Sequence, residues 1–286
     1  MRLLVPSDQS PPCLGIRWGG AWLLTALVLG SACAGRPTAS VQFSPPPRVP
    51  PTPETRARPT MLSAHFAVDD DPSRGGLDGI TVVFSEDVDA ASLRPGVFLV
   101  LLADGGRTLA KEAVLAPASE ADENRTVWLH GDFGDPRRRP PTDVIVIAPL
   151  HTETGSSLEG ALAPVRGFDE GGHIVHAQAQ VQPCASGQPR VRTFWTDALR
   201  DVTQEDLEAI TLELVGGRTV PPASFEDHAE AGSFIGESRD DNVLDLCVPV
   251  SERVVTVRVQ AGTFTDVPGH RTAASKATVA RAPAAE

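Results

Sequence analysis

An internal repeat of domain length constrains this chain more than any other feature of its sequence. Residues 81–88 lead to a Gly-Gly-Arg-Thr segment at 105–108, and residues 192–199 lead to the same four residues at 216–219. Both pieces recur after 111 residues (195 − 84 and 216 − 105). That period is too long for the unit of a solenoid. It fits two copies of one small domain.

Short runs of Val, Leu and Ile, interrupted by Gly and Pro, favour β structure along most of the chain. The 286 residues leave room for two ordinary domains once a leader is removed. We therefore predict an all-β fold of two tandem β-sandwich domains, at 61–182 and 183–286. A helical turn is expected after the first long strand of each copy, at 89–93 and 203–207. The expected strands are 62–67, 80–85, 97–102, 126–130, 144–148 and 173–181 in the first copy, and 190–195, 210–214, 243–248, 254–259 and 274–280 in the second.

The first 32 residues have the features of a secretory signal peptide. Arg2 and Arg17 precede an apolar run at 21–29, which is followed by small residues and Cys33. The run is shorter than the roughly 20 residues needed to span a bilayer. The Leu-Gly-Ser-Ala-Cys ending resembles a bacterial lipobox, in which the Cys carries the lipid as the first residue of the mature protein. We predict lipidation at Cys33, with ordinary cleavage and a soluble product as the alternative.

Residues 33–60 are predicted to form a Pro-rich disordered tether. Prolines at 45–47, 50, 51 and 53 stand among Ser, Thr and Arg. Such a segment cannot bury a core, and it stays extended, partly as polyproline II. A tether between a lipid and the first folded domain is its expected role.

Two cysteines remain after the leader and the lipid site, Cys184 and Cys247. Because an exported protein meets an oxidising compartment, we expect these two to form a disulfide. The bridge would close a loop of 63 residues (247 − 184). On the chain-entropy model such a loop contributes roughly 4 kcal/mol. Two unpaired thiols are the alternative.

The net charge of −12 argues against nucleic acid as a partner, because phosphate binding requires a basic face. The sequence also lacks a phosphate-binding Gly-rich loop, a Gly-x-Ser-x-Gly elbow and a His-Glu-x-x-His pair. A hydrolase on a sandwich scaffold therefore has no motif to support it.

Residues 80–93 resemble the opening of bacterial Ig-like domains of the S-layer type, which read I-x-V-x-F-S-E-x-V-D-x-x-S-L. Phe98, the Asp-Gly-Gly at 104–106 and the segment 124–129 also correspond to that family. The resemblance covers residues 61–155. The second copy departs from it, with Trp-Thr-Asp at 195–197 where the family has Phe-Ser-Glu. The resemblance implies an Ig-like β-sandwich used as a spacer or adhesive module in envelope proteins, and it supplies no catalytic residues.

Histidines and acidic residues offer two candidate metal sites, and we expect neither to bind an ion. His173 and His176 are three residues apart on an expected strand, so their rings should point to opposite faces, with His151 in a preceding loop. Oxygen-rich stretches could suit Ca²⁺, but they lack EF-hand spacing and read as solvated loops. These stretches contain Asp69, Asp70, Asp71, Glu237, Asp240, Asp241, Asn242 and Asp245.

Aromatic residues make up only 5% of the chain and Tyr is absent, so an aromatic carbohydrate-binding platform is not expected. The aromatic residues in strand patterns are predicted to pack in the cores instead, namely Phe84, Phe98, Trp128, Phe194 and Trp195.

The sequence thus predicts a non-catalytic lipoprotein of the bacterial cell envelope, with no cofactor and no bound metal. Its partners would be the inner or outer membrane, through the lipid, and an envelope or surface protein reached through loops or strand edges. The alternative is a periplasmic β-sandwich that binds copper or calcium. The Phe-Ser-Glu-x-Val opening also resembles the copper-resistance C proteins, whose later Asp-Gly-His element is matched faintly at 268–270.

Overall fold

The computed structural model describes residues 58–68, 78–118, 123–167, 169–200, 202–226, 241–266 and 269–281. The predicted leader, Cys33 and the tether up to residue 57 lie outside the described residues. Residues 55–286 form one compact unit. No helix in the described ranges is long and apolar enough to cross a membrane.

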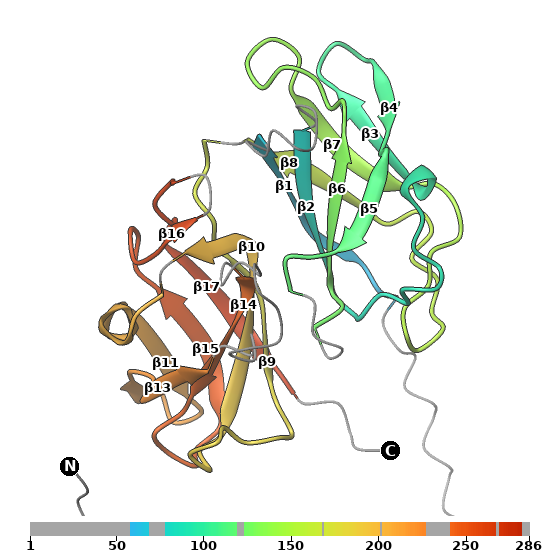
Figure 1. Ribbon diagram of the computed structural model, residues 1–286. Helices are drawn as coiled ribbons and strands as arrows, with labels where there is room; N and C mark the ends of the chain where they lie inside the picture. The colour runs from blue at the N-terminus through green and yellow to red at the C-terminus, as the bar shows by residue number, and fades with distance from the viewer. Residues whose placement is uncertain are drawn as a thin grey trace, which may run out of the picture. The chain divides into compact units, whose positions relative to one another are not determined.

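The all-β prediction is confirmed: the described chain builds two curled sheets and only short 3₁₀ turns (Figure 1). The first sheet has eight strands in the order β4-β3-β7-β8-β1-β2-β6-β5. Its only parallel pairing joins β1 to β8, and its other pairs are antiparallel. The strands are β1 (Met61–Val68), β2 (Asp78–Phe84), β3 (Phe98–Leu102), β4 (Arg107–Leu109), β5 (Glu112–Leu115), β6 (Thr126–Gly131), β7 (Pro141–Val146) and β8 (Leu162–Arg166).

The second sheet repeats this topology strand for strand. Its order is β12-β11-β15-β17-β9-β10-β14-β13, with the short β16 added on β10. The parallel pair recurs between β9 and β17, the counterparts of β1 and β8. Its strands are β9 (Ile174–Ala179), β10 (Arg190–Arg200), β11 (Ile210–Leu214), β12 (Thr219–Val220), β13 (Ser224–Glu226), β14 (Asp241–Cys247), β15 (Val254–Val259), β16 (Thr265–Asp266) and β17 (Ser275–Ala280).

One expected strand belongs to the other sheet. We placed 173–181 at the end of the first copy, but β9 pairs with β10 and β17. Residues 183–189, which follow the boundary that we expected after residue 182, form the turn between β9 and β10. In that turn the Gly187 N–H donates to the Cys184 carbonyl, and Gly187 has a φ of 80°. In place of a boundary at 182/183, we therefore propose one between β8 and β9.

The short 3₁₀ turns precede equivalent strands, η2 (Pro95–Val97) before β3 and η3 (Gln204–Ala209) before β11. Thr203 and Asp206 form a reciprocal capping box at η3, as expected for 203–207. The other expected turn, 89–93, is closed by a hydrogen bond from the Ser92 N–H to the Asp89 carbonyl and is not helical.

The equivalent glycine turns of the two copies are separated by one residue more than the repeat in the sequence predicts. The Gly105 N–H donates to the Leu102 carbonyl, and the Gly217 N–H donates to the Leu214 carbonyl. Both glycines have positive φ, 82° and 80°. The structural offset is therefore 112 (217 − 105), because the turn needs glycine at the left-handed position and not at its neighbour.

Each copy has its own core, and a third apolar cluster joins the two sheets. A β-bulge skips Leu62 in β1 and Val175 in β9, at equivalent points of the register. Both skipped residues pack on the joining cluster, which contains Val83 of β2 and its counterpart Phe194 of β10. The two copies thus meet through equivalent faces.

The glycine register can be tested by comparing two adjacent substitutions. Gly217→Ala should lower the free energy of unfolding by about 1–2 kcal/mol, because alanine resists the left-handed conformation. Gly216→Ala should change it by less than about 0.5 kcal/mol, because a Cβ there meets no atom within 4 Å and φ is not positive. Urea unfolding of both variants measures the difference. Equal losses would contradict the assigned register.

Candidate functional site

The junction between the two sheets holds a buried histidine that neither copy could place alone. His65 of β1 is 1% exposed, and its Nε2 lies 2.8 Å from the Glu170 carbonyl oxygen. Its Nδ1 lies 3.2 Å from Oδ2 of Asp197, which belongs to β10. The carbonyl can only accept, so Nε2 carries a proton, and the facing carboxylate favours a second proton on Nδ1. The contact therefore joins the two sheets through a buried histidine–carboxylate pair.

The surroundings of His65 raise its pKa. Burial alone would lower it, but the contact with Asp197, that residue's charge, the Glu170 carbonyl and the charge of Asp266 together outweigh burial. Asp266, on β16, is itself fully buried. Its pKa is raised, first by burial and also by the nearby charge of Asp197, while the backbone N–H of His270 opposes the shift.

A second charged group at the junction is Arg192 of β10, which is 1% exposed. Its guanidinium makes two hydrogen bonds to Asp245 of β14, of 2.9 and 3.0 Å. The same guanidinium lies 3.1 Å from Oε1 of Glu123, which precedes β6 in the first sheet. Both carboxylates are fully buried. One arginine therefore neutralises a carboxylate from each copy.

Equivalent positions also cross the junction in both directions. The Arg125 guanidinium of the first copy lies 5.1 Å from the centre of the Phe194 ring. The Asn242 side chain of the second copy donates to Thr126 Oγ1 at 2.8 Å and to the Trp195 carbonyl at 3.1 Å. Val243 occupies in the second sheet the position that Thr126 occupies in the first, so Asn242 is the counterpart of Arg125. The polar contacts thus follow the same approximate symmetry as the apolar ones.

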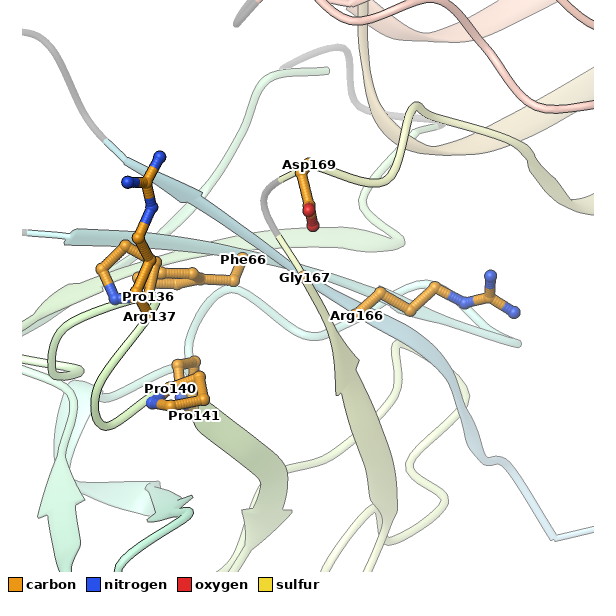
Figure 2. A pocket seen from close by; sticks show the side chains of 8 residues that line it. All are labelled: Phe66, Pro136, Arg137, Pro140, Pro141, Arg166, Gly167 and Asp169. Atoms are coloured by element: carbon orange, nitrogen blue, oxygen red, sulfur yellow. The ribbon is translucent and has the colours of Figure 1, made fainter.

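A cavity of about 320 Å³ lies beside this junction, on the first sheet. Phe66 follows His65 on β1 and lines the cavity. Successive side chains of a strand point to opposite faces, so His65 faces the junction while Phe66 faces the cavity. Figure 2 shows the guanidinium groups of Arg137 and Arg166 directed to different sides of the cavity, away from the prolines. Its lining is rigid and apolar in part, with charges of both signs at its edge: Phe66, Pro136, Arg137, Pro140, Pro141, Arg166, Gly167 and Asp169.

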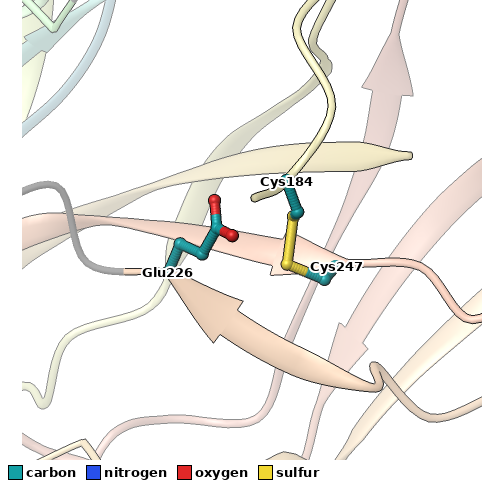
Figure 3. Close-up of side chains that lie close together, drawn as sticks. All are labelled: Cys184, Glu226 and Cys247. Atoms are coloured by element: carbon teal, nitrogen blue, oxygen red, sulfur yellow. A yellow bond between two sulfur atoms is a disulfide. The ribbon is translucent and has the colours of Figure 1, made fainter. Parts of the chain in front are cut away.

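Cys184 and Cys247 lie at disulfide distance, with an S–S separation of 2.08 Å (Figure 3). The bridge connects the β9–β10 turn to the end of β14, and both residues are buried. Glu226 lies beside it and accepts hydrogen bonds from the Ala185 N–H and from Arg190. Among the described residues, only these three bring ligand-type atoms within 4.8 Å of one another. Their sulfur atoms are already bonded to each other, so this group provides no thiolates.

His173 and His176 have different surroundings. His173 lies near His65 and Arg166, whereas His176 packs 5.7 Å from the Phe194 ring, between ring centroids. The pKa of each is lowered to about 4, mainly by burial. Arg166 adds to the effect at His173, and Arg125 adds to it at His176. His151 forms an isolated bridge with Ser157.

The second acidic stretch is only partly the loop that we expected. Asp241, Asn242 and Asp245 lie on β14, and the last two are fully buried. The expectation of a solvated loop is wrong for Asn242 and Asp245, because Asp245 contacts Arg192 and Asn242 contacts Thr126 across the junction. Asp69, Asp70, Asp71, Glu237 and Asp240 lie outside the described residues.

Four of the five aromatic residues predicted for the cores are fully buried: Phe84, Phe98, Phe194 and Trp195. Phe194 fills the cluster between the sheets and not a core. Trp128 is half-buried, 4.7 Å from the His130 ring between centroids.

Sequence reasoning missed the residues that couple the sheets, above all His65, Asp197, Arg192 and Glu123. One signal was present. Arg192 stands at an inward position of a long apolar strand, where an unpaired charge would be costly.

No protein-family model matches the chain, and no curated protein matches it. Among solved structures, two of the S-layer protein SbsC are similar at 14% identity and a TM-score of 0.30. The first covers 80% of this chain and 26% of its own length, and the second, of domains 1–6, covers 82% and 27%. A structure of the N-terminal part of SbsC covers 78% and 44%, with 14% identity and a TM-score of 0.29. The chain thus spans less than half the length of each, and likeness at these scores assigns neither fold nor function.

Removing the shared arginine should separate buried from exposed ion pairs. Arg192→Met removes the buried charge that contacts both Glu123 and Asp245, while Arg190 still lies 3.2 Å from Asp245. We expect a loss of about 3 kcal/mol in the free energy of unfolding. Arg218→Met is the matched control, because Arg218 and Glu252 form an exposed pair worth less than about 1 kcal/mol. Denaturant melts of both variants provide the comparison. Similar small losses would contradict the buried network.

The lowered histidine pKa predicts a specific acid sensitivity. Unfolded His176 binds a proton below about pH 6.5, whereas the folded side chain resists protonation until about pH 4. Stability should therefore fall as the pH drops through this window, and His176→Gln should reduce that fall. Melting temperatures between pH 7 and pH 4 measure it, with His151→Gln as the control. An unchanged pH dependence in His176→Gln would disprove the assignment.

Proposed function

We propose that this chain is a non-catalytic, lipid-anchored protein of the bacterial cell envelope. Its role is structural or adhesive, and it is exerted by two Ig-like β-sandwich copies that are coupled into one stiff unit. Cys33 carries the lipid, the tether at 33–60 connects it to the first copy, and a protein of the envelope or cell surface is the partner.

The observation that carries the proposal is the repeated topology together with its charged junction. Two sheets with the same strand order meet through equivalent faces. The buried Arg192–Glu123 contact makes bending at the junction costly, because separation would break an ion pair between two fully buried groups. A pair of copies held in this way suits a spacer or a platform for binding.

The order of the described strands also gives edge strands that a partner could reach. β4 and β5 end the order of the first sheet, and β12 and β13 end that of the second. The N–H and C=O groups of an edge strand can accept a further strand by β-augmentation. This mode of binding requires no pocket, in agreement with a protein that acts through surfaces.

The anchor is tested by mass spectrometry of protein extracted in detergent from membranes of its own host. We expect a mature chain that begins at Cys33, carries a lipid and is two hydrogens lighter because of the disulfide. Cys33→Ser should release the chain from the membrane fraction, whereas Cys184→Ser should not. A wild-type chain without lipid would refute the anchor, and a stoichiometric copper or calcium ion would favour the metal-binding alternative.

A further inference from the structure

The outer face of one half of the first sheet carries aliphatic side chains exposed to solvent. Three of the five exposed large hydrophobic residues within the described part of the chain lie there: Leu109 is 46% exposed, Ile147 is 45% exposed and Leu162 is 52% exposed. They come from β4, the residue after β7, and β8, which neighbour one another in the order β4-β3-β7-β8.

The strand register makes these residues one continuous row. Leu109 pairs with Leu99, Leu99 pairs with Ile145, and Ile145 pairs with Leu162. Residues paired across antiparallel strands point to the same face. Leu99 and Ile145 are half-buried, whereas their neighbours Phe98, Val100, Val144 and Val146 face the core. We call Leu99, Leu109, Ile145, Ile147 and Leu162 the aliphatic row.

The second copy shows that the fold does not require this row. In the equivalent strands Thr211 pairs with Arg258, and Arg258 pairs with Lys276. These residues replace Leu99, Ile145 and Leu162 at the same register positions. Gln260, whose N–H bonds to the Ala209 carbonyl, replaces Ile147, whose N–H bonds to the Val97 carbonyl. The same sheet face is polar in one copy and aliphatic in the other. Folding therefore does not require the aliphatic row, which indicates an interaction with another molecule.

Two charged residues beside the aliphatic row, Arg107 and Asp143, indicate which kind of surface would be complementary to it. Leu101 pairs with Arg107 on one side and with Asp143 on the other, so both charges border the row on the same face. Within the described residues neither Arg107 nor Asp143 forms an ion pair with another side chain. A face with one cation and one anion that have no ion-pair partner among the described residues, beside an apolar row, is complementary to itself.

We propose that the aliphatic row is a homodimer interface that binds the same face of a second copy of this chain. A two-fold axis parallel to the strands, between β3 and β7, lays Leu99 against Ile145 of the second chain and Leu109 against Leu162. It also brings Arg107 of each chain next to Asp143 of the other. A symmetric contact of this kind closes on itself and does not extend into a filament.

The contact is small, so the dimer should be weak in solution. Four strands about 4.8 Å apart and about five residues long cover roughly 300 Å² per chain. The two chains together bury roughly 600 Å², which is below the roughly 1,200 Å² of stable complexes and places the dissociation constant in the micromolar range or above. The interface does not depend on the lipid anchor, although confinement on a membrane would raise the local concentration of the chains.

Sedimentation velocity over a concentration series of the soluble full chain, from about 1 µM to about 1 mM, tests the proposal. We expect reversible dimers of the wild type. Leu162→Lys and Ile147→Gln, which copy the second repeat, should each weaken association by about tenfold or more without lowering the melting temperature. Val215→Gln is the control, because Val215 is 60% exposed at another site. A wild-type chain that stays monomeric throughout, or association that survives Leu162→Lys, would overturn the proposal.

A charge exchange makes the test specific for the two-fold geometry. Arg107→Asp and Asp143→Arg should each prevent self-association, because each brings like charges together across the axis. Mixed in equal amounts, the two variants should restore dimers, since each then supplies the charge that the other lacks. Failure of the mixture to associate would reject this geometry. A chain that dimerises only after residues 34–54 are removed would assign the row to the chain's own tether and would also overturn the proposal.

Discussion

The coupling of the two sheets depends on the buried positive charge of Arg192, which requires carboxylate partners. Arg192 is buried on the second sheet, where Asp245 satisfies one edge of its guanidinium. A further contact comes from Glu123 of the first sheet. Because an uncompensated charge at such a site is costly, neither sheet can move away without a large penalty. The apolar cluster around Val83 and Phe194 adds contact area, and the ion pair adds the requirement for one arrangement.

The repeated strand order accounts for the shape of the junction, and residue differences between the two sheets account for its chemistry. The two copies meet through the same bulged edge, with Leu62 and Val175 skipped at equivalent points. The charges are not duplicated, because the position of Arg192 is occupied by Thr81 in the first copy. The outer face diverged in the same way, with Leu162 in one copy and Lys276 in the other. Strand order persists under these changes because it depends on the inward positions, which remain apolar in both copies.

Much of the fold could be read from the sequence, with identifiable limits. Strands such as β11 and β15 were predicted at their observed bounds, because their β-branched residues stand between clear turn signals. β4, β5, β8, β12, β13 and β16 were missed, and they are short or, in β8, interrupted by Pro164. The segment 183–189 was misread, since a Pro- and Gly-rich turn inside a hairpin has the composition of a linker. Asp245 lies within the expected strand 243–248, but its burial was missed, because a buried carboxylate is expected only when its partner is known.

The sequence by itself determined the β class, the repeat and the choice of Cys184 and Cys247 as partners. The leader and the lipid on Cys33 are also predictions from the sequence alone. These follow from local composition and from spacing along the chain, which tertiary structure does not alter. Only the tertiary structure decided which sheet holds β9, which glycine occupies the left-handed turn position, and which carboxylates meet Arg192. It alone showed that the aliphatic row faces solvent in one copy while its counterpart is polar. The physical reason is that pairing between distant strands sets which side chains share a face, and one residue of register reverses the answer.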